Sequence, residues 1–510
     1  MYSKNAVSNA LTNILGQILI LVLNFIARKI FLWILDANYL GISGLFSSVI
    51  TMLSLAELGM GTAITFSLYK PLADNNDEII LALMRLYQKA YRFIGIFILA
   101  AGIAITPLVM YMTEVEVEIP HLRWIYILFV VNTSVSYFYS YNRTLIIADQ
   151  KEYRLAVIDY AGKLTLVVLQ TAVLILTKNY ILYLLMQIAV TFAQNYLVYR
   201  KVIKLYPVLR YTGGGQIPKV ILEEIKKNTL AMMLYKLAVV IVSGTDNLII
   251  SKSLGTIWVG LYSNYSMVIL SVQTICSKMI SSVTASIGSI VATGDKERSY
   301  QAYEIMQYIC FVVYGICTVV IFVLINPFVE LFLGREYLIS NSTIAIVLVN
   351  FYLLGMQGAS ASLRDAQGIF WQGKLRPLAQ GILNLVVSML LVSFMKNLTA
   401  VFLGTVISRV MTVTWFDPYV VHKYGFQDLN KIKTFVRKYL KYGGIVILSG
   451  AAAFFSANAC TVQSISGFIA KGMTSALVSG GFIFLCTFRT PEFRFLIRKT
   501  GQLWRSFHEK

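Results

Sequence analysis

Long apolar stretches separated by short polar segments run through almost the whole chain, and most of the charges lie in the polar segments. A membrane-spanning helix needs about 20 mostly apolar residues, and the chain contains fourteen stretches of that kind. They are too long and too uniformly apolar for barrel strands, so helices are the expected spanning structure. The predicted spans lie near residues 7–35, 40–69, 88–112, 121–142, 155–177, 180–199, 228–251, 256–290, 305–329, 338–363, 378–395, 398–420, 442–459 and 463–487.

The composition is typical of a membrane protein. Of the 510 residues, 57% are apolar and only 13% are charged, whereas a soluble domain carries about a quarter charged residues. A nucleic-acid binder with the same net charge of +20 would show dense basic patches on a polar surface. Disordered, fibrous and ordinary cytosolic classes are excluded for the same reason.

Cofactor and metal motifs are absent from the sequence. The five cysteines are scattered along apolar stretches without CxxC or Cys/His spacing, so neither a disulfide framework nor a zinc site is expected. No Walker A sequence occurs, so ATP hydrolysis within this chain is not expected. The sequence predicts no cofactor, no metal and no catalytic residues, and therefore no enzyme.

Positive charge marks the cytoplasmic side of each span. Basic residues gather in every second loop, while the intervening loops hold only Arg123, Lys178, Lys252, Arg335 and Lys396. Because cytoplasmic loops carry the excess of Lys and Arg, both termini are predicted to lie in the cytoplasm. The first apolar stretch lacks a small-residue cleavage site after a short apolar core and is expected to be a retained span.

A glycine-rich linker divides the chain into two halves that resemble each other. The linker, YTGGGQIP, lies at 211–218. The segments LDANYLG (35–41) and LGTIWVG (254–260) correspond at an offset of 219, and Pro107 corresponds to Pro327 at an offset of 220. We predict an N-lobe of six spans (1–210), a cytoplasmic linker and amphipathic segment (211–227), a C-lobe of six spans (228–425), and two further spans with a basic tail (426–510).

Polar side chains follow one face of the first two helices in each half. At about 100° per residue they fall on narrow arcs, and the arcs of the first helices coincide at the repeat offset of 219. Four such faces predict the walls of an aqueous cavity. The predicted polar lining comprises Asn13, Gln17, Asn24, Ser54, Glu57, Asn247, Asn264, Ser271 and Thr274. Ser and Thr stripes also serve helix packing in membranes, so that reading stays open for the hydroxyl residues.

Three cations within the spans favour an anionic substrate. Arg28, Lys236 and Lys278 lie on the polar faces, where a low-dielectric surround strengthens their attraction for an anion. Arg28 also lies near a helix end, from which it can reach the interface. Glu57 and Asp246 are candidates for ion coupling, with pairing to a cation as the simpler alternative.

The remaining intramembrane features receive no functional role. Lys163, Arg409 and Lys471 have no polar stripe beside them. The tyrosine-rich run at 137–141 is interpreted as an interfacial aromatic belt.

Residues 40–96 resemble bacterial polysaccharide repeat-unit flippases of the Wzx type, within the multidrug/oligosaccharidyl-lipid/polysaccharide exporter (MATE/MOP) superfamily. The motifs that carry the likeness are AELGMG at 56–61 and SGTDNLIISKSLG at 243–255. The resemblance implies an all-α membrane fold with about 14 spans, in which two six-helix lobes are related by pseudo-twofold symmetry and two C-terminal helices form a groove for lipid. It further implies a flippase in the bacterial inner membrane that moves undecaprenyl-diphosphate-linked oligosaccharide outward for capsule or related polysaccharide assembly, with polysaccharide polymerase machinery as a further partner.

Other functions remain open from the sequence. A lipid II flippase differs from this prediction only in its substrate. A MATE-type cation or drug antiporter has the same lobes but needs an acidic or aromatic cavity. A polysaccharide polymerase is less favoured, because it normally carries large loops with catalytic carboxylates and none is evident.

Overall fold

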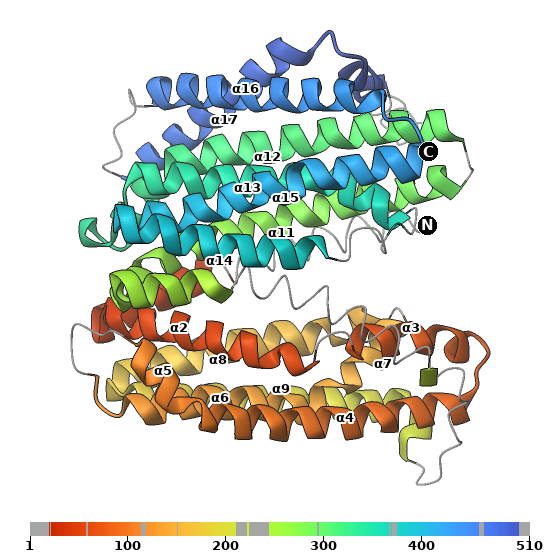
Figure 1. Ribbon diagram of the computed structural model, residues 1–510. Coiled ribbons are helices and arrows are strands. Elements are labelled where there is room, and N and C mark those ends of the chain that lie inside the picture. Colours follow the sequence, from red (N-terminus) through yellow and green to blue (C-terminus); the bar gives the residue numbers. More distant parts are fainter. Residues whose placement is uncertain are drawn as a thin grey trace. The chain divides into compact units, whose positions relative to one another are not determined.

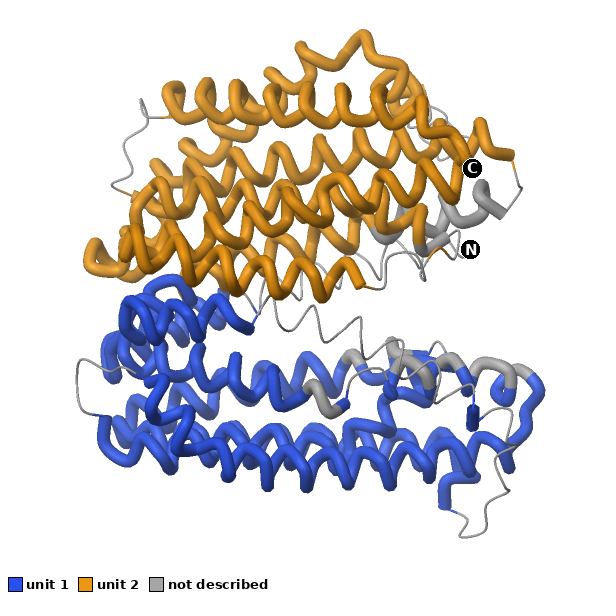
Figure 2. Tube along the Cα trace, viewed as in Figure 1, with its two compact units in different colours: residues 1–263 blue, residues 264–510 orange. Residues whose placement is uncertain are grey.

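The computed structural model is helical throughout the residues that it describes, which contain no strand (Figure 1). These residues are 20, 22–57, 60–113, 119–149, 151–210, 222–223, 244–292, 295–366, 369, 375–457 and 464–498. The chain forms two compact units, residues 1–263 and 264–510 (Figure 2).

Unit 1 contains the helices of the first half together with the segment at 244–263. Its helices are Val22–Leu35, α2 (Ala37–Leu53), η1 (Ser54–Glu57), α3 (Met60–Ala73), α4 (Asp77–Ala104), α5 (Thr106–Met112), α6 (Leu122–Ser140), α7 (Asn142–Ala148), η2 (Glu152–Leu155), α8 (Ala156–Thr177), α9 (Tyr180–Leu205), η3 (Pro207–Arg210) and a helix at 244–254. The helix α11 (Thr256–Ala292) begins in unit 1 and continues into unit 2.

Unit 2 contains the remaining long helices. They are α12 (Lys296–Phe332), α13 (Asn341–Ala366), α14 (Arg376–Met395), α15 (Leu398–Val420), α16 (Lys431–Ala457) and α17 (Ile465–Thr487). A short turn, η4 (Arg335–Tyr337), precedes α13, and a π-helical turn, η6 (Val421–Phe426), extends α15. The two helices that follow the predicted repeat, α16 and α17, pack against each other and against α12.

Local capping residues explain where several helices begin. Asp36, Asn76, Asn179, Asp295 and Asn397 each accept a hydrogen bond from a backbone N–H in the first turn of the helix that follows. A side-chain oxygen at this position satisfies a donor that the helix itself leaves unpaired. The short polar segments between apolar stretches therefore act as helix start signals.

Each predicted span coincides with a helix or a pair of helices in the described residues, although those at 7–35 and 228–251 are described only in part. Eight helices of the described residues are long and apolar enough to cross a membrane, or up to ten if each of two bent pairs counts as one span. A total of fourteen spans stays a prediction.

Two predicted spans are interrupted. The span at 40–69 is divided between α2 and α3, with η1 between them. The span at 88–112 bends by 55° between α4 and α5, because Pro107, in the first turn of α5, has no N–H with which to continue the α4 ladder. The corresponding Pro327 lies inside the continuous helix α12.

The turns that join the first two helices of each half share one backbone feature. Asp36 has φ of 80° and Gly255 has φ of 97°, and the two positions differ by the repeat offset of 219. Gly255 adopts a positive φ without strain, while Asp36 offsets the cost by capping α2 through Asn38 N–H at 2.6 Å. The two turns therefore share a positive φ at the corresponding position of the repeat, although the residues there differ.

Candidate functional site

Glu57 lies in a cage of hydroxyl groups within unit 1. Tyr91 donates a hydrogen bond to one carboxylate oxygen of Glu57, and Tyr137 donates to the other at 2.7 Å. The Tyr87 hydroxyl donates to Tyr91 at 2.7 Å, and Thr144 donates to Tyr87 at 3.3 Å. We call these five residues the tyrosine cage. It gives a carboxylate inside a span two direct donors and a continuous chain of hydroxyls.

The backbone explains how Glu57 reaches this position. It ends the 3₁₀ turn η1, at the interruption between α2 and α3. Irregular backbone at membrane depth is tolerated where it is buried in protein or lines a cavity, and such breaks mark binding sites in transporters. Gly61, one helical turn later, leaves room for the cage, because a Cβ there would lie 2.8 Å from the Tyr87 hydroxyl. The AELGMG motif therefore supplies the carboxylate of the cage and the space that the Tyr87 hydroxyl occupies.

A close crossing joins α2 to the start of α11 within unit 1. A Cβ on Gly41 would lie 2.1 Å from the Thr256 carbonyl oxygen, and a Cβ on Gly260 would lie 2.3 Å from the Ala37 carbonyl oxygen. Gly260 corresponds to Gly41, and Thr256 to Ala37, at the repeat offset of 219. The contact is therefore reciprocal, as a twofold axis requires. We call these four residues the glycine crossing.

Two hydrogen bonds flank the glycine crossing. Arg28 donates to the Ser263 hydroxyl at 2.9 Å, and Asn247 donates to the Ser48 hydroxyl at 2.9 Å. Arg28 and Asn247 also correspond at the offset of 219. Each therefore extends from the first helix of its own half to the second helix of the other half. The structure thus brings two predicted site residues to one pseudo-symmetric contact.

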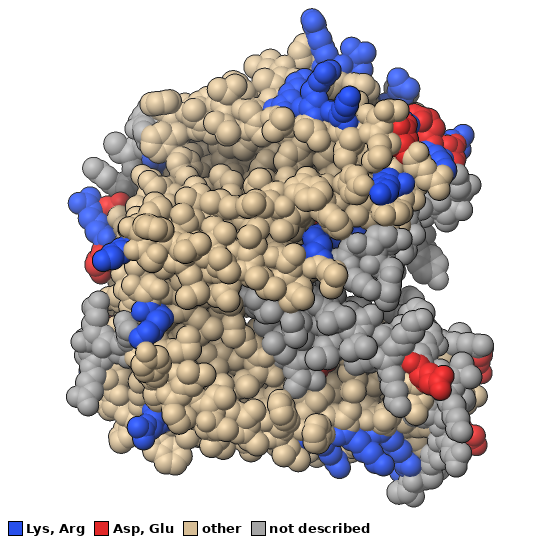
Figure 3. Space-filling view, in the orientation of Figure 1, with Lys and Arg blue, Asp and Glu red and all other residues tan. Residues whose placement is uncertain are grey.

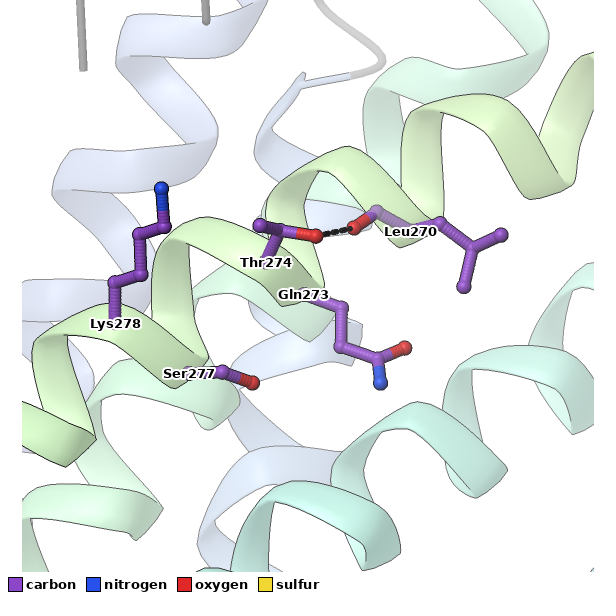
Figure 4. A pocket seen from close by; sticks show the side chains of 5 residues that line it. All are labelled: Leu270, Gln273, Thr274, Ser277 and Lys278. Carbon is purple, nitrogen blue, oxygen red and sulfur yellow. Dashed lines mark hydrogen bonds between the residues drawn. The ribbon is translucent and has the colours of Figure 1, made fainter. Parts of the chain in front are cut away.

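In unit 2, Lys278 lines a pocket of about 370 Å³ on α11 with Leu270, Gln273, Thr274 and Ser277. The side chains of Gln273 and Ser277 extend from one side of the helix, whereas the Lys278 side chain extends away from them, toward the side of Thr274 (Figure 4). The Ser277 hydroxyl also contacts the Tyr314 hydroxyl of α12 at 3.2 Å. One cation among three polar side chains suits a polar anion.

The other predicted site residues have varied surroundings. Ser54 and Ser271 donate to backbone carbonyls one turn earlier, at 2.9 and 2.7 Å, as does Thr274 at 2.8 Å. Asn24 and Asp246 are half-buried, and Asn264 is buried. The predicted positions Asn13, Gln17 and Lys236 lie outside the described residues.

Sequence reasoning missed the tyrosines of the cage. Tyr137 belongs to the run interpreted as an interfacial belt, but the structure buries this side chain and bonds it to Glu57. The interpretation was wrong for Tyr137, because α6 packs against α4 and buries this side chain. A buried tyrosine hydroxyl needs a hydrogen-bond partner, and Glu57 provides it. The signal that was available is the spacing of Tyr87 and Tyr91, which places both on one face of α4.

A second polar network, in unit 2, holds an arginine to which the sequence assigned no role. Arg409 of α15 donates to Asn350 at 2.7 Å and to Gln357 at 3.0 Å, both on α13. Gln357 in turn donates to Asp417 at 3.1 Å. Asp417 also pairs with Arg364 at 3.2 Å and with Arg376 at the start of α14. This arginine network joins α13, α14 and α15 through buried charges.

Among the residues that the structure describes, no cluster of three His, Cys, Asp or Glu side chains is suited to a metal ion. Cys276 and Cys317 are close, with their sulfur atoms 3.6 Å apart, and both are free thiols.

The fold is that of transporters in the MOP superfamily. The chain aligns with an inward-facing multidrug resistance MATE family transporter of that superfamily at a TM-score of 0.64 and 14% identity, covering 81% of this chain and 99% of that one. It aligns with the lipid II flippase MurJ, in an inward closed conformation, at a TM-score of 0.64 and 12% identity, covering 95% and 99%. A Vibrio cholerae MATE transporter aligns at 0.56 and 12% identity, covering 82% and 98%. The chain is a multi-pass membrane protein with this fold.

Residues 93–342 match the model of a family described as polysaccharide biosynthesis protein. This match and the MOP fold confirm the resemblance to polysaccharide flippases that residues 40–96 predicted. No curated protein sequence matches the chain.

Proposed function

We propose that this protein is a flippase that moves undecaprenyl-diphosphate-linked oligosaccharide repeat units from the cytoplasmic to the outer leaflet, for capsule or a related cell-surface polysaccharide. It would act in the bacterial cytoplasmic membrane with both termini inside, alongside polysaccharide polymerase machinery. The observation that carries the proposal is the match of residues 93–342 to a polysaccharide biosynthesis family on a transporter fold.

The extent of the structural matches favours a lipid-linked substrate over a drug. The lipid II flippase covers 95% of this chain, whereas the inward-facing MATE transporter covers 81%. The two helices after the repeat, α16 and α17, pack on α12 and leave large apolar side chains such as Ile447 and Leu477 exposed, as a lipid-facing surface requires. We infer that the lipid tail lies along these helices.

The charges of the predicted cavity favour a diphosphate. Arg28, Lys236 and Lys278 supply positive charge, and the Lys278 pocket adds the hydroxyl and amide groups that a sugar binds. An inside-negative membrane potential also drives an anion outward, with about 2.3 kcal/mol per charge for each 100 mV. A head group with two negative charges would gain roughly 4 to 5 kcal/mol per 100 mV if no counter-ion crosses.

Alternating access needs a contact about which the two halves rock. The glycine crossing suits this role, because its backbones touch without intervening side chains and its two halves are related by the repeat. With the predicted topology it lies near the outer surface, and the hydrogen bonds of Arg28 and Asn247 would close that side. Opening outward would require both hydrogen bonds to break.

Ion coupling is assigned to Glu57, with Asp246 as the second candidate. The tyrosine cage stabilises the carboxylate of Glu57 by hydrogen bonds, and its hydroxyl chain provides a route for a proton toward Thr144. A Glu57→Gln variant that exports normally but no longer responds to an imposed pH gradient would support this assignment.

The direct test is mass spectrometry of the lipid-linked sugars that accumulate on the cytoplasmic side when the protein is depleted. Accumulation of a lipid-linked oligosaccharide repeat unit supports the proposal, and accumulation of lipid II supports the rival flippase. Lys278→Gln should reduce export, while Lys163→Gln removes an exposed lysine of α8 and serves as the matched control. Equal export by the two variants, with normal protein levels, would refute the anion site.

A further inference from the structure

Six basic side chains lie exposed on one face at the end of unit 2. Lys and Arg side chains gather there in the space-filling view (Figure 3). They extend from the first three turns of α16 and from the segment at 488–498, which is helical from 491 onward. The six residues are Lys433, Arg437, Lys441, Arg489, Arg494 and Arg498. We call them the basic face.

The local charge is strongly positive. Residues 431–441 and 488–498 together contain eight Lys and Arg residues and a single acidic residue, Glu492. The carboxylates of Glu297 and Glu304 on α12 pair with Lys431 and Lys438, which are not part of the basic face. Within the described residues, none of the six side chains of the basic face forms an ion pair.

A partly buried ion triad holds the segment at 488–498 against α12 and α16. Lys438 of α16 contacts Glu304 of α12 at 2.6 Å and Glu492 at 2.5 Å. Glu492 is only 4% exposed, so the one acidic side chain of the segment is turned inward. The Tyr308 hydroxyl contacts the Thr487 hydroxyl at 2.8 Å and adds a second attachment to α12. These contacts hold the backbone of the segment in place, while Arg489 and Arg494, on either side of Glu492, remain exposed.

Apolar side chains are interleaved with the cations. Leu440 is 69% exposed and Val436 46%, beside the stripe that Lys433, Arg437 and Lys441 form at every fourth residue. In the C-terminal segment, Phe495 and Ile497 are 44% and 54% exposed. A surface for nucleic acid or for an acidic soluble protein does not require exposed Leu and Ile among the cations.

A helix with basic and apolar side chains that adjoins a membrane span has the pattern of an interfacial helix. The face continues directly into the span formed by the rest of α16 and follows the end of α17. Its charges therefore lie at the depth where a bilayer presents its phosphate groups.

We propose that the basic face binds the head groups of anionic phospholipids at the membrane surface and so fixes α16 and α17 in the bilayer. Phosphates accept hydrogen bonds from the guanidinium groups, while the apolar side chains enter the boundary between head groups and acyl chains. The proposal does not depend on the sugar or on the direction of transport.

The test compares variants of the full-length protein purified in detergent. Phosphatidylglycerol and, separately, phosphatidylcholine are titrated into each sample, and the number of retained lipids is measured by native mass spectrometry. The first variant carries Arg489→Gln, Arg494→Gln and Arg498→Gln. The control carries Arg200→Gln, Lys201→Gln and Lys204→Gln, which remove three exposed charges at the end of α9 in unit 1.

The C-terminal variant should bind phosphatidylglycerol at least about tenfold more weakly than the control, because each basic residue near an anionic surface contributes on the order of fivefold. Its binding of phosphatidylcholine should be unchanged. The difference should shrink in high salt, since exposed charges are screened. Because all six substituted side chains are exposed, both variants should keep the wild-type thermal midpoint.

Three outcomes would overturn the proposal. Equal phosphatidylglycerol binding by the two variants would show that the basic face is not special. If the C-terminal variant lost phosphatidylcholine binding to the same extent as phosphatidylglycerol binding, the surface would be merely apolar. Unchanged lipid binding, together with lost binding of RNA or of an acidic protein, would assign the face to a soluble partner.

Discussion

Replacing Gly260 by alanine tests the glycine crossing with a single methyl group. The new Cβ would lie 2.3 Å from the carbonyl oxygen of Ala37 and 3.0 Å from the backbone nitrogen of Gly41. The first distance is about 1 Å shorter than the ordinary contact that begins at 3.4 Å. Both neighbours are backbone atoms, so no side chain can turn away, and the two helices must separate.

The magnitude follows from two opposing effects. Overpacking of this kind costs about 1 to 3 kcal/mol, while alanine is more favourable than glycine inside a helix by roughly 0.5 to 1 kcal/mol. Gly443 of α16 supplies a matched control, because a Cβ there meets nothing within 4 Å. Both substitutions gain the same helix propensity, so their difference isolates the steric cost of about 1 to 3 kcal/mol.

The measurement is the thermal midpoint of each variant in the same detergent, together with export of the lipid-linked substrate in cells that depend on the protein. Gly260→Ala should melt below Gly443→Ala, by roughly 2 to 4 °C per kcal/mol, the shift typical of domains of about 150 to 250 residues. Export should fall as well, because the hydrogen bonds of Arg28 and Asn247 flank the separated helices. Gly41→Ala should behave like Gly260→Ala, since the contact is reciprocal.

Equal stability and equal export for Gly260→Ala and Gly443→Ala would refute the reasoning. A loss of stability with normal export would keep the packing argument but remove the crossing from the transport mechanism.

Two further predictions concern charges outside the proposed cavity. Asp417→Asn should destabilise unit 2 by about 3 to 5 kcal/mol, because two arginines lose the buried carboxylate that they share; a denaturation midpoint equal to that of wild type would contradict this. Burial disfavours the charged form of Asp149, but hydrogen bonds from Lys151 and Tyr206 outweigh it and hold the pKa of Asp149 below its usual range. Its contribution is therefore present above the unfolded pKa of about 3.9 and lost as pH falls through the lower folded pKa. Tyr206→Phe should lower the thermal midpoint at neutral pH, and its gap to wild type should close below about pH 4; a gap that is constant with pH would exclude the carboxylate as its cause.

The sequence by itself determined the class of fold. Apolar stretches of span length leave the backbone only one way to satisfy its hydrogen bonds in lipid, which is a helix. The same reasoning located a helix at each predicted span, and the spacing of LDANYLG and LGTIWVG anticipated the turns at Asp36 and Gly255. The resemblance to polysaccharide flippases also came from the sequence, through AELGMG and the residues around it.

Only the tertiary structure decided which polar side chains meet. Periodicity places Glu57 on a polar face, but the hydroxyls that hold it come from α4 and α6, which are distant in sequence. Arg409 was given no role because its own helix has no polar stripe, whereas its partners lie on α13. A helical pattern reports the face of one helix, and the partner on that face is set by how the helices pack. For this reason the sequence predicted the polar faces of this protein, while the tyrosine cage, the glycine crossing and the arginine network required the fold.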